Sequence, residues 1–530
     1  MRMSRGKSLP LSAAVLAVAT LVVTACSVEG GAASRREHGD KGASLPPLPA
    51  RFAQQTVDWA GCEGVSSEPV AGAECGWVEV PVDYAAPDKE TIRLRVSRVK
   101  AQDRSRRLGS LLYNPGGPGA PGAADVADGT WTAGERARAR YDLVGFDPRG
   151  LGASAPIECP GGVPQEPEDL PRTVADAEKA FTAARALARS CHRGSGTVLA
   201  HMDSASVARD LEVLRRVLGD DRLNYTGISY GTFLGRQYMR LFPDKVGRFV
   251  LDGVVDPARD MRQVALLDVR TDEEALRRYA ADLVARGDLR LGATSEDVVR
   301  RITGLVADLE RTPLRGPGGR RLTGSAVSAY LRTVTRQENW GRLTDALAAA
   351  VDGDAGAFDD MARDGAAGAG EEGAAGDEES APGQEEQERT EAMGNPAVLC
   401  LDSRGAPRSP REMLDLADEF ARKSPLFGRG IAWQMLDCAT WPIAPTGKVE
   451  PVTAPGAPPV LLVSYTDDPQ TPLENARAVK AQLADSALLV RTGQGHGAYA
   501  SETPSQCTDR VVDAYLVDGR LPEGITNCPG

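Results

Sequence analysis

The sequence lacks an excess of basic residues. Its 530 residues include 62 Lys and Arg against 74 Asp and Glu, so the formal net charge is −12. Proteins that bind nucleic acids neutralise phosphates with a basic face, so this charge balance argues against a nucleic-acid partner. Apolar residues make up 42% and charged residues 26% of the chain, which is close to the average for globular proteins and excludes a wholly disordered chain.

Metal-ligand patterns are also missing. No Cys-x-x-Cys sequence occurs and none of the four histidines is spaced as a zinc ligand pair, so we expect no metal site. Long hydrophobic runs are scarce as well. Beyond the N-terminal segment, no stretch without charges reaches the ~20 residues that a membrane-spanning helix needs, so we expect no such helix there.

Residues 1–25 have the layout of a secretory signal peptide. Basic residues precede an apolar stretch from Leu9 to Val23, which ends in small residues. The sequence V-T-A-C at 23–26 resembles a bacterial lipobox, which predicts that Cys26 is lipidated. Ordinary cleavage near Ala25 and free secretion are the alternative. Residues 26–50 are predicted to form a flexible tether, so we expect an exported protein, either anchored to the membrane by lipid alone or secreted.

The cysteine count supports export. Nine cysteines are present, and setting Cys26 aside leaves an even number, as expected for a disulfide-bonded exported chain. The remaining cysteines fall into sequence neighbours, which gives the simplest prediction of their pairing. The predicted bonds are Cys62–Cys75, Cys159–Cys191, Cys400–Cys438 and Cys507–Cys528.

Strand-like and helix-like segments alternate along the chain. Residues 77–82 and 92–96 alternate apolar and polar residues, which predicts antiparallel edge strands with one solvated face. Short apolar runs at 110–113, 141–146 and 460–463 are typical of central parallel strands that are buried on both faces. The alternation predicts an α/β fold with a mostly parallel, doubly wound sheet.

A long helical segment interrupts this alternation. Residues 258–430 have helical patterns, so we predict an inserted helical cap domain between two parts of a core, at 51–257 and 431–530. Within it, residues 364–396 contain ten acidic residues and one basic residue among Gly and Ala. This composition predicts a disordered surface loop, with an acidic recognition arm as the alternative.

A G-x-S-x-G motif supplies a nucleophile. The sequence G-I-S-Y-G at 227–231 follows an apolar run and precedes a helical pattern. In the α/β-hydrolase fold such a motif forms a tight strand-to-helix turn, and its glycines allow the serine hydroxyl to stand clear of the backbone. We therefore predict that Ser229 is the catalytic nucleophile. A Gly-Ser turn without catalytic function is the alternative.

A single histidine can complete a triad in the usual order. The α/β-hydrolase triad runs Ser, acid, His along the chain. Of His38, His192, His201 and His496, only His496 follows Ser229. The acid is expected after the apolar run at 460–463, where Asp467 and Asp468 are adjacent. One of these carboxylates must orient the imidazole and stabilise its positive charge.

A glycine-rich loop follows the strand predicted at 110–113. Its sequence is N-P-G-G-P-G at 114–119, at the place where α/β-hydrolases put one donor of the oxyanion hole. We predict that the backbone amides of Gly117 and Tyr230 form this hole. A loop that is required only for its turn geometry is the alternative.

Four motifs occur together in this chain. They are N-P-G-G-P-G at 114–119, D-P-R-G-L-G at 147–152, G-I-S-Y-G-T-F-L-G at 227–235 and D-P-Q-T-P at 468–472. Together with the segment from Gly495 to Cys528, they resemble the secreted tripeptidyl aminopeptidases, which are prolyl-aminopeptidase-like serine peptidases. The resemblance spans about 76–256 and 396–528. In that family's D-P-x-T-P pattern the acid directly precedes proline, which implies Asp468 as the triad acid. The acidic tract after Asp364 departs from the family.

The resemblance also implies a function. Members of the family release short peptides from free N-termini, with a helical cap over one end of the cleft. Peptide or protein N-termini are therefore the expected substrates, and the acyl-enzyme mechanism needs no metal or cofactor. Such an enzyme must bind the substrate's α-ammonium with carboxylates, which the sequence does not single out. The carboxylates considered are Asp252, Asp256, Glu273, Glu274 and Glu338.

Two other functions fit the same residues. An esterase or lipase-like hydrolase is possible in principle because the same triad cleaves esters and a fold does not fix the substrate. A non-catalytic surface binding protein that retains the fold is the second alternative. The sequence gives no indication of the oligomeric state.

Overall fold

The computed structural model describes most of the chain from Pro46 onward. The described residues are 46–66, 68–160, 169–317, 319–332, 340–367, 384–451, 453–483, 485–501 and 503–530, with the backbone alone over 362–367 and 384–391. The predicted signal peptide at 1–25, the lipidation site Cys26 and most of the predicted tether lie outside these residues. In the part of the chain that is described, no helix is both long and apolar enough to cross a membrane.

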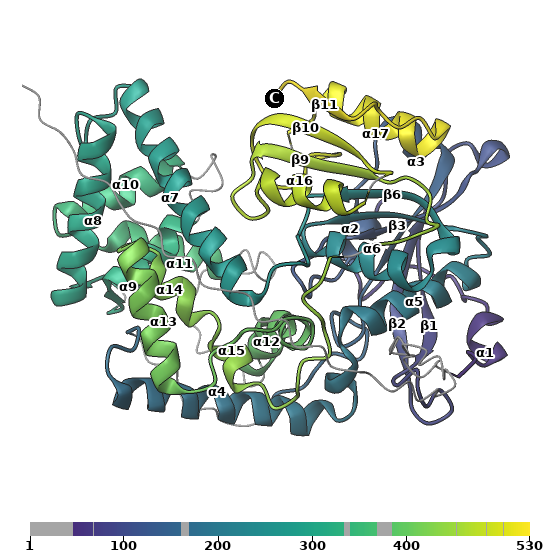
Figure 1. Cartoon of the computed structure of the whole chain (residues 1–530), viewed down its shortest axis with the longest axis horizontal. Helices are drawn as coiled ribbons and strands as arrows, with labels where there is room; N and C mark the ends of the chain where they lie inside the picture. Colours follow the sequence, from purple (N-terminus) through teal and green to yellow (C-terminus); the bar gives the residue numbers. More distant parts are fainter. Residues whose placement is uncertain are drawn as a thin grey trace, which may run out of the picture. The chain divides into compact units, whose positions relative to one another are not determined.

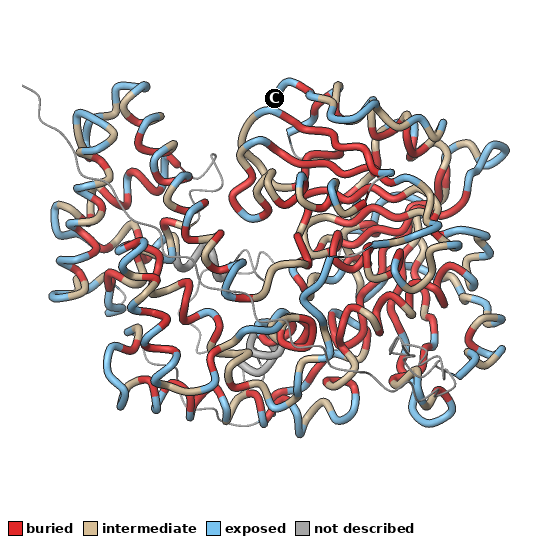
Figure 2. The backbone as a smooth tube through the Cα atoms, in the orientation of Figure 1, coloured by how far each residue is buried: buried red, intermediate tan, exposed pale blue. Residues whose placement is uncertain are grey.

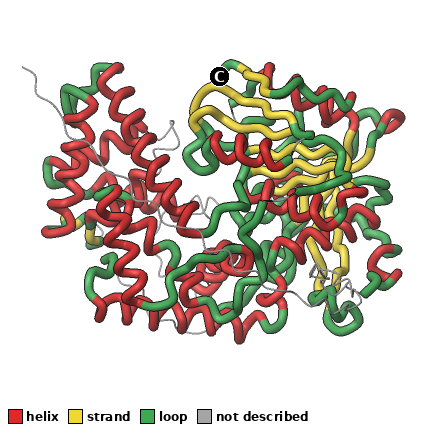
Figure 3. Tube along the Cα trace, in the orientation of Figure 1, coloured by secondary structure: helices red, strands yellow, loops and turns green. Residues whose placement is uncertain are grey.

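A nine-stranded sheet forms the scaffold of the α/β part of the chain, which is drawn on the right of Figures 1 and 3. The strands are β1 (Ala73–Pro81), β2 (Thr91–Val99), β3 (Gly109–Asn114), β4 (Tyr141–Phe146), β5 (Leu223–Ile228), β6 (Val246–Asp252), β9 (Leu461–Asp467), β10 (Ala487–Gln494) and β11 (Ile525–Cys528). Their order is β1-β2-β4-β3-β5-β6-β9-β10-β11. The pairs β1/β2 and β2/β4 are antiparallel and the other pairs are parallel. The predicted parallel sheet with an antiparallel edge is confirmed.

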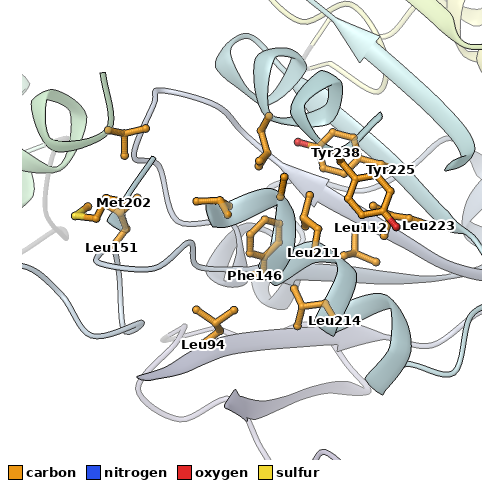
Figure 4. Packing of buried hydrophobic residues seen from close by; sticks show 14 of the residues in the cluster. Leu94, Leu112, Phe146, Leu151, Met202, Leu211, Leu214, Leu223, Tyr225 and Tyr238 are labelled. Carbon is orange, nitrogen blue, oxygen red and sulfur yellow. The ribbon is translucent and has the colours of Figure 1, made fainter. Parts of the chain in front are cut away.

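Helices cover both faces of the sheet. Neighbouring residues such as Leu111 and Leu112 enter different buried clusters, because successive side chains of a strand point to opposite faces. One face packs against α5 (Ser204–Val217), α6 (Tyr230–Leu241) and α16 (Leu473–Gln482). The other packs against α2 (Ala123–Asp128), α3 (Glu135–Arg140) and α17 (Gln506–Asp518). Apart from the edge strand β11, the strands of the sheet are buried along most of their length (Figure 2). Figure 4 shows the first cluster around Phe146 and Tyr225.

The chain between β6 and β9 is mainly helical, as the sequence predicts. It contains α7 (Met261–Ala285), α8 (Ser295–Arg311), α9 (Gly324–Leu331), α10 (Trp340–Val351), α11 (Gly356–Ala367), α12 (Gln384–Asp402), α13 (Pro410–Lys423), α14 (Gly428–Trp433) and α15 (Leu436–Thr440), with a short hairpin of β7 (Leu314–Arg315) and β8 (Arg321–Leu322). Most of these helices share a hydrophobic cluster of their own, separate from the clusters on the sheet.

Two helices pack across the predicted boundaries of the insertion. The first half of α4 (Val174–Ser195) precedes the insertion, yet Ala177 and Phe181 belong to the helical cluster. The last turns of α12 lie inside the insertion, yet Ala397 and Leu401 belong to a cluster of the sheet. Helical periodicity identifies which face of a helix is apolar but not the partner that covers it, so the sequence could not place these two helices.

Both described ends of the acidic tract are helical, which differs from the predicted loop. Helix α11 extends to Ala367 and helix α12 begins at Gln384, so both enter the range 364–396 that composition assigned to a loop. Ala, Glu and Gln are strong helix formers, which explains helix in segments with few large apolar residues. Residues 368–383 of the tract lie outside the described residues.

Eight cysteines form the four neighbouring pairs. Cys62–Cys75 joins the segment before β1 to that strand, and Cys159–Cys191 joins a loop to α4. Cys400–Cys438 links α12 to α15, and Cys507–Cys528 links α17 to β11. Each bond therefore closes a loop between elements that are near in sequence, and none joins the first half of the chain to the second.

A buried ion pair anchors the D-P-R-G segment. The Arg149 guanidinium donates to both carboxylate oxygens of Asp210 on α5, at 2.6 and 2.7 Å, and both side chains are 0% exposed. Tyr84 donates its hydroxyl to the same carboxylate at 2.7 Å. Arg149 also donates to the carbonyl oxygens of Pro81 and Val82, at 2.9 and 2.6 Å. The pair thus ties β1 and the loop after β4 to α5.

Candidate active site

Ser229 lies on the sharp turn between β5 and α6. Its φ of 57° and ψ of −122° are strained for a residue with a side chain. Two contacts hold the turn: the Ser229 amide donates to the Asp252 carbonyl oxygen at 2.8 Å, and Thr232 donates its amide to the Ser229 carbonyl oxygen at 2.9 Å. A Cβ atom on Gly231 would lie 2.7 Å from the Asn114 carbonyl oxygen, so this position requires glycine. The turn therefore has the form predicted from the motif.

The structure brings His496 and Asp468 together. His496 Nδ1 lies 2.9 Å from Asp468 Oδ2 and 3.1 Å from Oδ1. The Asp468 carboxylate also accepts the amides of Gln470 and Thr471 at 2.9 Å and the Thr471 hydroxyl at 2.8 Å. These donors fix the carboxylate behind the imidazole. Asp467 points elsewhere, because its carboxylate is partly exposed, accepts the Thr466 hydroxyl and pairs with Arg278.

The histidine loop packs against the nucleophile turn. A Cβ atom on Gly497 would lie 3.1 Å from the Cγ2 atom of Ile228, which is the residue before Ser229. A Cβ atom on Gly253 would lie 3.1 Å from His496 Cε1. The loop after β10 and the ends of β5 and β6 therefore meet at the carboxyl edge of the sheet, where open α/β sheets place their ligand sites.

The loop after β3 lies against the same turn. A Cβ atom on Gly116 would lie 2.4 Å from the Ile228 carbonyl oxygen and 3.0 Å from Ser229 Cβ. Gly116 and Gly117 both have a φ of 100°, which glycine alone adopts readily. Among the described residues, neither the Gly117 amide nor the Tyr230 amide donates to a protein acceptor. Both amides thus remain able to bind an oxyanion.

A carboxylate from the helical insertion contacts the residue after the nucleophile. Asp402, at the end of α12, accepts the Tyr230 hydroxyl at 2.9 Å and the Ser204 hydroxyl and amide at 2.5 and 3.0 Å. Burial raises the pKa of Asp402 to about 7. The sequence did not indicate this contact, because Asp402 and Tyr230 are far apart in the chain and no local motif contains both.

A cleft of about 700 Å³ opens beside Ser229. Gly117, Pro118 and Tyr230 line it near the nucleophile, and Asp256, Asp268 and Asp272 supply acidic groups to its wall. Asp268 and Asp272 lie one turn apart on α7. Arg332 donates to Asp272 at 2.8 Å, whereas the side-chain carboxylate of Asp268 accepts no hydrogen bond from any described residue. Burial raises the pKa of Asp268 to about 7 and also raises that of Asp272.

Most of the carboxylates that the sequence offered as ligands of the substrate's α-ammonium do not line the cleft. Asp252 is fully buried below the histidine loop, and Glu273 accepts the Ser424 hydroxyl and pairs with Arg277. Glu274 is exposed, and Glu338 lies outside the described residues. Of that group, Asp256 alone lines the cleft. A signal for Asp272 was present, because it interrupts the apolar face that Ala265, Val269 and Leu276 form on α7.

Comparison with known proteins agrees with this geometry. A family model described as "alpha/beta hydrolase fold" matches residues 109–331, and one described as "TAP-like protein" matches residues 424–528. The chain is 35% identical to a tripeptidyl aminopeptidase of Streptomyces lividans, over 90% of this chain and 88% of that one. It is 32% identical to the serine protease Hip1 of Mycobacterium tuberculosis, over 100% of both chains.

A third relative carries a different name. The chain is 31% identical to a carboxylesterase B of Mycobacterium tuberculosis, over 98% of both chains. All three relatives are named as enzymes that hydrolyse amides or esters, and the alternative of a non-catalytic binding protein finds no support among them. The fold, the strained serine turn and the relatives together identify a serine hydrolase, and the chain belongs to the tripeptidyl aminopeptidase family of α/β-hydrolase serine peptidases.

Proposed function

We propose that the protein is an exported serine aminopeptidase that releases short peptides, with tripeptides as the expected product, from free N-termini. One observation carries the aminopeptidase proposal: two carboxylates, Asp268 and Asp272, line the same cleft as Ser229. An endopeptidase or esterase has no need of a buried acidic group in its substrate cleft, whereas an aminopeptidase must compensate the positive charge of its substrate.

The catalytic roles in this proposal follow from the arrangement of the triad. Ser229 attacks the scissile carbonyl carbon while His496 accepts the hydroxyl proton, and Asp468 holds the imidazole through Nδ1 and stabilises its charged form. The amides of Gly117 and Tyr230 donate to the oxyanion of the tetrahedral intermediate. His496 then returns the proton to the leaving amine, and water hydrolyses the acyl-enzyme by the reverse sequence.

Asp268 is the proposed ligand of the substrate's α-ammonium. Its carboxylate accepts no hydrogen bond from any described residue, so it remains available to a ligand. Asp272 is already paired with Arg332, which leaves it a supporting role beside Asp268. A charge-assisted hydrogen bond in a partly dry cleft is among the stronger polar contacts, so it can select substrates with a free N-terminus.

Replacing Asp268 by asparagine is expected to raise KM for a free-amine peptide, lowering kcat/KM roughly 10- to 100-fold. The substrate is a tripeptide with a chromogenic amide after its third residue. In the unaltered enzyme KM for this peptide rises as the pH falls through about 7, because Asp268 becomes protonated and neutral there. The asparagine variant should lose this pH dependence of KM.

Three comparisons test the Asp268 prediction. The N-acetylated peptide should be a poor substrate of the unaltered enzyme, and hydrolysis of a simple acyl ester should be unaffected by Asp268→Asn. Asp282→Asn is the matched control, because Asp282 lies on the same helix, pairs with Arg286 and does not line the cleft. Equal cleavage of the free and acetylated peptides would contradict the aminopeptidase proposal and favour an endopeptidase. Cleavage of the ester alone would favour the esterase alternative, to which the carboxylesterase relative points.

Export and lipid anchoring rest on the N-terminal sequence. The four disulfides are compatible with an oxidising compartment outside the cytoplasm. Changing Cys26 to alanine is expected to move the mature protein from the membrane fraction to the soluble exported fraction, since one lipid-bearing residue is lost. Fractionation followed by mass spectrometry of the N-terminus measures this. An unchanged membrane fraction would show that the anchor is not at Cys26.

A further inference from the structure

Asp252 is a buried carboxylate for which the triad mechanism has no role. It is the last residue of β6 and its side chain is fully buried. Its Oδ1 atom accepts no hydrogen bond from any described residue, although it is shielded from solvent. An unpaired carboxylate oxygen in the interior costs free energy, so an amide or an apolar side chain would be more favourable at this position in the absence of a role for the charge.

The second oxygen of Asp252 binds the histidine loop. Oδ2 accepts the backbone amides of Ala498 and Tyr499, at 2.7 and 2.8 Å. These residues follow His496 by two and three positions. The loop contains glycines on both sides of His496, which leave its conformation free unless other contacts hold it. Two charge-assisted hydrogen bonds to a single buried carboxylate supply such contacts.

The backbone of Asp252 binds the nucleophile turn at the same time. Its carbonyl oxygen accepts the Ser229 amide at 2.8 Å. The next residue, Gly253, lies against the His496 ring, where an added Cβ atom would approach Cε1 to 3.1 Å and Nδ1 to 3.3 Å. One residue therefore contacts both the segment that carries the nucleophile and the segment that carries the base.

The charge of Asp252 also acts on the triad. Its electrostatic partners among the described residues are His496, on the loop after β10, and Asp468, on the loop after β9. Burial raises the pKa of Asp252 to about 6, so the carboxylate is ionised through the neutral range. A second negative charge near the imidazole adds to the stabilisation that Asp468 provides when His496 accepts the proton of Ser229.

We propose that Asp252 is a positioning residue that fixes the His496 loop against the nucleophile turn and stabilises the protonated imidazole. The proposal rests on the assignment of Ser229, His496 and Asp468 as the triad. In this proposal a second carboxylate, at the end of β6, acts on His496 in two ways: it binds the backbone of the His496 loop, and its negative charge stabilises the protonated imidazole.

The variant Asp252→Asn tests the role of the negative charge of Asp252 without changing the size of the side chain. Asn at this position keeps the size and can accept both loop amides, but it removes the negative charge. Asp252→Asn should therefore fold with an unchanged thermal midpoint. For an acyl ester, whose hydrolysis does not use Asp268, it should move the acid limb of the kcat/KM profile to lower pH, by roughly half a unit to one unit. The direction follows because the protonated imidazole loses stabilisation, so the active neutral form persists to lower pH.

A second variant tests the positioning role. Asp252→Ala removes both hydrogen bonds to the loop, so kcat for the tripeptide substrate should fall roughly 100-fold while KM changes little. The rate at which an organophosphonate labels Ser229 should fall in parallel. This labelling requires the base to activate the serine but does not require the peptide substrate to bind. If the alanine variant does not fold, the pH profile of the asparagine variant still decides the question.

Controls distinguish failure of this inference from failure of the proposed triad. Asp142→Asn removes another buried carboxylate that accepts a backbone amide, that of Ala101, at the opposite end of a strand, and it should leave the acid limb in place. Ser229→Ala must abolish turnover, or the triad itself is wrong. With turnover abolished by Ser229→Ala, an unshifted acid limb in a folded Asp252→Asn enzyme would overturn the role assigned to Asp252.

Discussion

Ser229→Ala should lower kcat/KM for the chromogenic tripeptide amide by roughly 10⁴- to 10⁶-fold, with substrate binding largely retained. The variant lacks the atom that forms the acyl-enzyme, so His496 has no hydroxyl proton to accept. The oxyanion amides and the cleft remain, and they account for the small residual rate. The measurement is steady-state hydrolysis of the tripeptide amide and of an acyl ester by the same preparations.

The controls for Ser229→Ala address its fold and its specificity. The alanine side chain removes one oxygen without adding bulk at a turn with positive φ, so the thermal midpoint should stay close to that of the unaltered enzyme. Ser105→Ala, at an exposed serine away from the cleft, should retain full activity. Loss of amide cleavage together with loss of ester cleavage would assign both to one nucleophile. Turnover that survives the substitution would exclude Ser229 and with it the whole triad.

Asp210→Asn should lower the free energy of unfolding by about 3–5 kcal/mol. The change leaves the Arg149 guanidinium buried without its counter-charge, and both side chains are 0% exposed in the native protein. Pro81 and Val82 still offer carbonyl oxygens, but these dipoles do not replace a negative charge. The shift is measured as the change in the urea midpoint at constant slope, which reports stability rather than a change in the unfolded state.

An exposed ion pair provides the control for this prediction. Arg51 and Asp88 are also 2.7 Å apart, but their side chains are 48% and 77% exposed. Asp88→Asn should therefore change the free energy of unfolding by less than about 1 kcal/mol. If Asp210→Asn proved as mild as Asp88→Asn, burial would not be the property that makes the Arg149 pair important, and the D-P-R-G segment would need another explanation.

Local motifs predict part of the candidate site. The G-x-S-x-G turn requires glycines because the chain approaches itself closely, and this requirement is visible in the sequence. His496 was the only histidine after Ser229, so elimination selected it. Asp468 and Asp467 could not be separated by local chemistry, because both follow the same strand, and the resemblance to the family was needed to choose between them. In the structure Asp468 is the one that reaches His496.

Contacts between distant segments could not be predicted in this way. Asp268 reaches the cleft because α7 begins just after β6 and passes beside it, and Asp402 reaches Tyr230 because α12 returns from the insertion to the sheet. Both placements depend on how helices pack against one another. A single sequence shows that α7 and α12 exist and which residues each contains, but the packing partner of a helical face is a property of the folded chain.

The order in which the chain is made has a consequence for the insertion between β6 and β9. These two strands are neighbours in the sheet, but Asp252 is synthesised long before Leu461. A nascent chain that has completed β6 holds the Ser229 turn without the His496 loop, and the edge of β6 stays unpaired until β9 is synthesised. An unpaired parallel edge invites pairing with other chains, so the interval between the synthesis of β6 and of β9 is a stage at which the nascent chain is prone to aggregate. With Ser229 and His496 in their proposed roles, the site is complete only when the last strands fold, and a chain truncated before His496 carries the serine without its proposed base.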